Sequence, residues 1–175
     1  MARKFGEASI QNRNIGKSWK KIQGKKWGLR GKAKTMFLFV KMKIPYLQQK
    51  SNIFGIISRP LVTIKVYSKT KNIWIPVYDA LADTGADITL FPRYLGEMVV
   101  DDITKGKYVE IRGIASNAVV VGFMHKVKLE VFHKQIEASL VIADTDDVRP
   151  VLGRLEALDL FKVVFDKGKF IEINE

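Results

Sequence analysis

The chain has 175 residues, of which 47% are hydrophobic and none is cysteine. This length and apolar content fit one small domain with its own core, and the lack of cysteine excludes disulfides and thiolate chemistry. The start shows no apolar stretch typical of a signal peptide, and the apolar run at residues 36–40 is far too short to span a bilayer. We therefore expect a cytoplasmic protein that makes no membrane contact.

The net charge of +12 is concentrated near the N-terminus. Residues 1–50 hold 14 of the 30 Lys and Arg residues and only one of the 18 acidic residues. Beyond this point the two signs almost balance, and residues 1–35 show little apolar periodicity. We expect residues 1–41 to form a basic, flexible extension and residues 42–175 to form the folded domain.

Three interpretations of the basic extension stay open. Residues 1–35 could bind nucleic acid or another polyanion, with Trp19 and Trp27 stacking on bases. The segment could instead be a solvated tail with incidental polyanion affinity. The natural protein could also begin later, at Met36 or Met42. The phosphate contacts of the first interpretation would come from Lys20, Lys21, Lys25, Lys26, Arg30, Lys32 and Lys34.

The remaining sequence indicates an all-β domain. In the first strand, Val62, Ile64 and Val66 alternate with polar residues, which is typical of a half-buried strand. A turn at 69–72 and a strand at 73–82 follow. Short helices are expected at 92–98 and 154–161. Further strands are expected around 127–131, 136–142, 161–165 and 170–173, with turns at 132–135 and 166–169. Many short strands at close spacing favour a barrel or a sandwich.

A carboxylate follows the strand at 73–82 directly, in the motif Asp83-Thr84-Gly85-Ala86-Asp87. Two carboxylates, each on a tight turn, can share a proton when they face each other in one site, and the pair can then activate water. The motif occurs once here, so the chemistry would need two copies of the chain. Far downstream, Val151-Leu152-Gly153-Arg154 forms a second distinctive motif. By itself Asp-Thr-Gly is a weak pattern, because such residues are common in turns.

Taken together and in this order, the two motifs resemble the retropepsin-like (retroviral-type) aspartic proteases, and cellular, prokaryotic-type members most. The resemblance covers roughly residues 53–173 and also includes Pro45-Tyr46 and Arg59-Pro60 ahead of the first strand. It implies an acid-protease barrel with one or two short helices, working as a homodimer without a cofactor or metal. Asp83 would be catalytic, with Thr84 and Gly85 orienting it.

The resemblance also implies roles for the surrounding residues. Ala86, Gly153 and Arg154 would support the catalytic loop, with Arg154 pairing with Asp87. The segment 109–116 resembles the flap that closes over a polypeptide substrate, although it carries Ala115-Ser116 where familiar viral members have glycine. Substrate contacts are therefore expected from Asp87, Ile88, Gly113, Ile114 and Ala115, with Val151 as a further subsite residue.

Other site patterns are weaker. His125 and His133 flank a predicted strand and could bind a metal only with further ligands. The acidic segment 144–147 lacks the glycine and terminal Glu of a known calcium loop, which favours a solvated turn. Because a fold does not fix an activity, the alternative function is a catalytically inactive module for dimerisation or peptide binding, with or without a nucleic-acid-binding arm.

Overall fold

The computed structural model describes residues 41–113 and 119–174, all within one compact unit, Leu38–Glu175. Apart from Lys41, the expected extension at residues 1–41 lies outside the described residues, and so do its tryptophans and its basic cluster. The extension and its proposed partners therefore stay predictions. No helix in the described ranges has the length and apolar character needed to cross a membrane.

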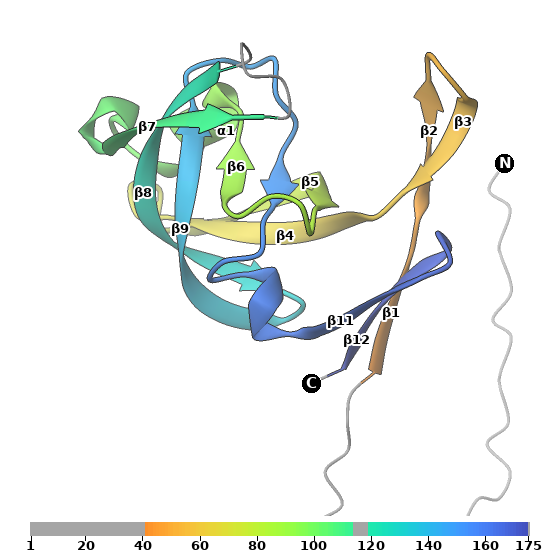
Figure 1. The fold of residues 1–175 in the computed structure, drawn as a ribbon. Helices are drawn as coiled ribbons and strands as arrows, with labels where there is room; N and C mark the ends of the chain where they lie inside the picture. Colours follow the sequence, from red (N-terminus) through yellow and green to blue (C-terminus); the bar gives the residue numbers. More distant parts are fainter. Residues whose placement is uncertain (1–40, 114–118, 175) are drawn as a thin grey trace, which may run out of the picture. The chain divides into compact units, whose positions relative to one another are not determined.

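Six strands close into a barrel (Figure 1), which confirms the all-β barrel prediction at this level. Their order is β4-β5-β10-β6-β9-β8, and a further pairing of β4 with β8 closes the ring. The strand β7 (Lys107–Arg112) pairs with the first residues of β8, 119–124, outside this ring. The barrel strands are β4 (Leu61–Ser68), β5 (Ile73–Ala82), β6 (Thr89–Phe91), β8 (Val119–Val131), β9 (Lys134–Ala143) and β10 (Val151–Leu152).

The alternation seen in the sequence places the core inside this barrel. Val62, Ile64 and Val66 of β4 are buried, whereas Thr63 and Lys65 between them are exposed. The same period of two applies to β8, where Val127, Leu129 and Val131 are buried. Removal of these side chains from water is the main stabilising contribution to the fold. Other fully buried side chains include Phe91, Leu140, Ile142 and Leu152.

A second sheet is built from the two ends of the described unit. Its order is β1-β12-β11, all antiparallel, with β1 at Lys41–Pro45, β11 at Lys162–Asp166 and β12 at Phe170–Asn174. Ile171 and Ile173 of the central strand β12 are buried in the main core. The pairing of β1 with β12 was not predicted.

The helical segments are short. The α-helix α1 (Arg93–Val99) confirms the helix expected at 92–98, and its Gly96 packs so closely on β9 that a Cβ atom there would lie 2.2 Å from Ile142. The 3-10 helix η1 covers Ile103–Lys105. The short helix expected at 154–161 is confirmed only in part: turns at 154–157 lead into a 3-10 helix η2 at Leu158–Leu160, and no α-helix forms there.

A positive φ of 57° at Glu156 explains that difference, because an α-helix cannot continue through a left-handed residue. One further pair of strands, β2 (Leu47–Ser51) and β3 (Gly55–Arg59), forms a separate two-stranded sheet that the sequence analysis did not predict.

Candidate active site

Asp83 follows β5 directly and begins the loop that leads to β6. Its backbone N–H donates to the carbonyl of Leu152 at 3.1 Å, and its carbonyl accepts from Ala86 N–H at 3.3 Å. Its side-chain Oδ1 accepts a hydrogen bond from Gly85 N–H at 2.8 Å. A carboxylate bonded within its own loop has a restricted orientation, so the local order Asp-x-Gly helps to orient this group.

The tip of this loop faces away from the barrel core. Asp83 is half-buried, whereas Thr84 and Gly85 are exposed. In the described part of the chain the Thr84 hydroxyl has no hydrogen-bond partner, although the main chain on both sides of it is bonded. The Thr84 hydroxyl is therefore accessible from outside the described residues, beside the half-buried Asp83 carboxylate.

The strand β10 joins the two sequence motifs. It lies between β5 and β6, with Val151 opposite Leu81 in a parallel pairing and opposite Leu90 in an antiparallel one. Leu152 pairs with Ala82, the residue immediately before Asp83. Motifs almost 70 residues apart in the chain are thus neighbours in one sheet.

Gly153 is required by the close approach of two backbones. A Cβ atom at this position would lie 2.4 Å from the carbonyl carbon of Ile88 and 2.5 Å from its oxygen. The N–H of Gly153 donates to the buried Thr89 Oγ1 at 3.2 Å. A side chain here would push the downstream motif off the loop, which gives the supporting role predicted for Gly153 a physical basis.

Arg154 binds the end of the loop that is farther from Asp83, at Ala86 and Asp87. Its Nη2 lies 2.8 Å from Oδ1 of Asp87, and its backbone N–H donates to Ala86 O at 2.9 Å. The hydrogen bond to Asp87, followed by the negative charge of Asp159, raises the pKa of Arg154 above its usual value. The next residue, Leu155, donates its N–H to Asp87 O. The pairing expected between Arg154 and Asp87 is therefore present, and Ala86 takes part in the support through its backbone.

Ile88 lines an open pocket next to the loop. The other lining residues are Met124, Ser139, Leu155 and Glu156, and the pocket volume is about 430 Å³. Ile88 and Leu155 immediately follow the two motifs, and the pairing of β10 with β5 and β6 brings them to the same pocket. Its lining makes Ile88 a reasonable contact residue for an apolar side chain.

The predicted flap is in part outside the described residues. Strands β7 and β8 form an antiparallel hairpin whose last pair is Arg112 with Val119. Gly113 follows β7, and a Cβ atom added to it would meet nothing within 4 Å. Ile114 and Ala115 lie outside the described residues, so their role as substrate contacts stays a prediction.

An ion pair that the sequence analysis missed fixes the segment after Arg154. Lys126 Nζ of β8 lies 2.6 and 2.8 Å from the two carboxylate oxygens of Glu156, and Ser139 N–H of β9 donates to the same carboxylate at 2.6 Å. The Lys126 and Ser139 hydrogen bonds lower the pKa of Glu156 from 4.5 to about 2. Nothing in the local sequence signals this contact, because its partners lie on two other strands.

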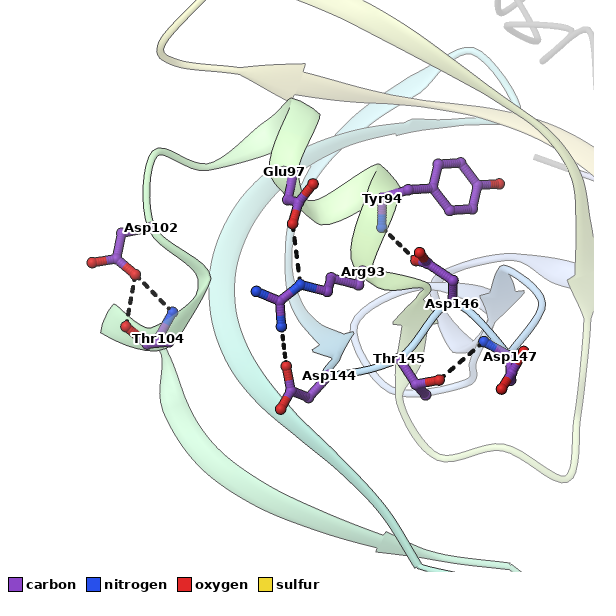
Figure 2. A network of polar contacts seen from close by, with 9 residues as sticks. All are labelled: Arg93, Tyr94, Glu97, Asp102, Thr104, Asp144, Thr145, Asp146 and Asp147. Carbon is purple, nitrogen blue, oxygen red and sulfur yellow. Dashed lines mark hydrogen bonds and ion pairs between the residues drawn. The ribbon is translucent and has the colours of Figure 1, made fainter.

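The acidic segment 144–147 is bonded to α1 rather than arranged around a cation (Figure 2). Arg93 pairs with Asp144 and, at 3.1 Å, with Glu97, while Tyr94 N–H donates to Asp146 Oδ1 at 2.8 Å. The chain then continues to Pro150, whose carbonyl accepts from Leu81 N–H at 2.9 Å. The network therefore fixes the chain that leads from β9 to β10.

The histidines lie on separate features. His125 Nε2 lies 2.8 Å from the carbonyl oxygen of Ile103, whereas His133 is exposed in the turn between β8 and β9 with a φ of 67°. Among the described residues, no three potential ligands of the His, Cys, Asp or Glu type are grouped closely enough to hold a metal ion.

Comparison with known proteins adds no assignment: no protein-family model matches the chain, and no curated protein is significantly similar to it.

Proposed function

We propose that the chain is an aspartic endopeptidase of the retropepsin-like type whose active site is completed by a second copy. One observation carries the proposal. Asp83 lies on an outward-facing loop with its Oδ1 held by Gly85 N–H, and residues 152–155 brace that loop through five hydrogen bonds and ion pairs. Such bracing holds an exposed carboxylate in a fixed position, which acid–base chemistry between two carboxylates requires.

The proposed mechanism uses one carboxylate from each copy. Two aspartates within hydrogen-bond reach cannot both ionise easily, so they share one proton. The ionised member removes a proton from water while the protonated member donates to the substrate carbonyl. The brace of Arg154 and Gly153 supplies the fixed geometry that this chemistry needs. The Thr84 hydroxyl, which has no hydrogen-bond partner among residues 41–113 and 119–174, is available to bond across the pair.

The proposed substrate is a polypeptide in an extended conformation. Such a chain forms strand-like hydrogen bonds with backbone groups and places alternate side chains in pockets. The pocket beside Ile88 and Leu155 offers an apolar surface for one of these side chains. The hairpin of β7 and β8 is the element that would cover the substrate and exclude water.

Substitution of Asp83 tests the proposal. Asp83→Asn removes the charge and keeps the volume, and we expect cleavage of a denatured protein substrate to fall at least about 100-fold. Asp79→Asn is the matched control, since Asp79 is exposed on β5, the strand that leads to Asp83, and its φ of 55° suits asparagine. Peptide release is measured by mass spectrometry between pH 3 and 7.

Three outcomes are informative. Cleavage lost in Asp83→Asn and retained in Asp79→Asn supports the proposal. A folded Asp83→Asn protein that cleaves at the wild-type rate contradicts it. A folded wild-type dimer that binds extended peptides and never cleaves them favours the alternative, a non-catalytic binding module.

A further inference from the structure

Strands β2 and β3 form a hairpin with a well-defined turn. They pair from Leu47 opposite Arg59 to Ser51 opposite Gly55. Ser51 Oγ accepts hydrogen bonds from two backbone N–H groups of the turn, each at 3.3 Å. Gly55 has a φ of 73°, which glycine adopts without strain. The register and turn are therefore fixed locally, and the hairpin is an ordered projection.

The end of this hairpin is apolar and exposed. We define the hairpin tip as Ile53, Phe54 and Ile56, whose side chains are 82%, 75% and 67% exposed. No residue in 47–59 is buried. A two-stranded hairpin by itself is marginally stable in water, and a cluster of large exposed apolar side chains is typical of an interaction surface. The hairpin tip therefore needs a partner that the single chain does not provide within the described residues.

The base of the hairpin is next to the candidate catalytic loop. Immediately after β3, Pro60 O accepts the N–H of Ala82, the residue before Asp83, at 2.9 Å. Gln49 of β2 accepts a 3.4 Å hydrogen bond from Arg149, in the segment that leads to β10. Figure 1 shows the hairpin extending from this region away from the barrel strands. The hairpin thus starts on the side of the subunit that carries Asp83.

We infer that the hairpin tip packs against a second copy of this chain and helps to hold the two half-sites together. The inference rests on the proposed function, because two Asp83 carboxylates that share a proton must approach to about 3 Å. A five-residue strand spans roughly 17 Å. A hairpin of that length, rooted beside Ala82, is long enough to contact a second copy whose Asp83 loop meets this one.

A second copy suits the hairpin better than other occupants. The half-site is incomplete without it, and a two-fold arrangement buries both hairpin tips at once. Two such tips contribute six large apolar side chains to one interface, the kind of residue that dominates the centre of stable interfaces. The other occupants, residues 1–40 of the same chain or an unrelated protein, are distinguished by the experiment below.

The first test measures assembly directly. In the full-length chain, Ile53→Ser, Phe54→Ser and Ile56→Thr are combined, and the dimer dissociation constant is measured by sedimentation velocity. We expect at least a tenfold increase with the far-ultraviolet circular dichroism unchanged, since these side chains support no core. The control combines Tyr94→Ser with Met98→Ser on α1, which are 50% and 37% exposed, and leaves the constant unchanged. An unchanged constant in the triple variant overturns the inference.

The second test locates the tip. A photoreactive benzoylphenylalanine replaces Phe54 in an isotopically light chain, which is mixed with heavy wild-type chain before irradiation. Light-to-heavy cross-links support the inference, whereas cross-links confined to residues 1–40 of the same chain overturn it. Neither readout uses catalysis, so the two proposals can fail separately. A dimer that depends on the hairpin tip but does not cleave peptides contradicts only the proposed function. A dimer that cleaves peptides and does not depend on the hairpin tip contradicts only this inference.

Discussion

Arg154 and Asp87 form an ion pair, with 2.8 Å between Nη2 and Oδ1, that connects the segment after β10 to the loop after β5. Both side chains are substantially exposed, at 42% and 72%. An exposed pair of this kind contributes only about 0–1 kcal/mol to the free energy of unfolding. Its importance therefore lies in positioning: it holds the loop whose other end carries Asp83.

The first prediction follows from this contrast between stability and position. Arg154→Ala should lower the melting temperature by about 5 °C or less while reducing peptide cleavage at least tenfold, because the loop loses its lateral support. Thermal unfolding and steady-state kinetics are measured together. The control Lys65→Ala breaks a surface ion pair with Glu130 at 2.7 Å, across the β4–β8 pairing, and should leave cleavage unchanged. A loss of cleavage that is fully accounted for by unfolding of Arg154→Ala at the assay temperature would contradict a positioning role.

The second prediction concerns the close backbone approach at Gly153. Gly153→Ala places a Cβ atom 2.4 Å from the Ile88 carbonyl carbon, so backbone must move, at a cost of about 1–3 kcal/mol. Gly113→Ala is the matched control, because nothing lies within 4 Å of the added atom. Urea unfolding of both variants checks this. Similar midpoints for the two variants would show that the backbone at Ile88 yields to the added Cβ atom at little cost in stability.

Local sequence signals predicted β4, β5, β9 and the second half of β8, but not the short barrel strands β6 and β10. The strand β5 has the predicted bounds, 73–82, and α1 is shifted by one residue from 92–98. Alternating apolar residues and flanking turn residues determine such elements, so a single sequence is sufficient. The supports of the candidate site, Gly153 and Arg154, came from the resemblance instead, because no periodicity could indicate that β10 lies between β5 and β6.

The errors have tertiary causes. The segment after Arg154 has apolar spacing typical of a helix, yet Arg154 and Leu155 donate their N–H groups to the Asp87 loop, and Glu156 binds Lys126 and Ser139. Contacts with distant strands thus override the local preference. The β2–β3 hairpin was missed because its apolar residues, in the run 53–57, do not alternate with polar ones.

The third prediction is a dependence of stability on pH through Glu156. The contacts of Glu156 in the folded state lower its pKa to about 2, from the value of 4.5 that applies to the unfolded chain. Because the folded pKa is lower, the stabilisation is complete above about pH 4.5 and is lost as the pH falls toward 2. Glu156→Gln should therefore lower the free energy of unfolding by up to about 1 kcal/mol at pH 6. The difference from wild type should shrink below pH 4.5 and vanish near pH 2.

Urea unfolding at pH 6, 4 and 2.5 measures this difference. The double variant Lys126→Met with Glu156→Gln completes a mutant cycle, which separates the ion pair from the hydrogen bond of Ser139 N–H. If the difference in the free energy of unfolding between wild type and Glu156→Gln stays constant from pH 6 to 2.5, the contact with Lys126 and Ser139 does not lower the pKa of Glu156.

The fourth prediction distinguishes a shared active site from two independent ones. If each working site takes one Asp83 from each copy, a mixed dimer of wild-type and Asp83→Asn chains has one carboxylate and cannot share a proton. Adding a ninefold excess of Asp83→Asn chains should therefore lower the activity per wild-type chain about tenfold once subunits have exchanged. The Asp79→Asn variant, added in the same excess, should cause no loss. Activity that is unaffected by Asp83→Asn chains, under conditions where mass spectrometry detects mixed dimers, would mean that a single Asp83 suffices, and the requirement for two copies would then have to be abandoned.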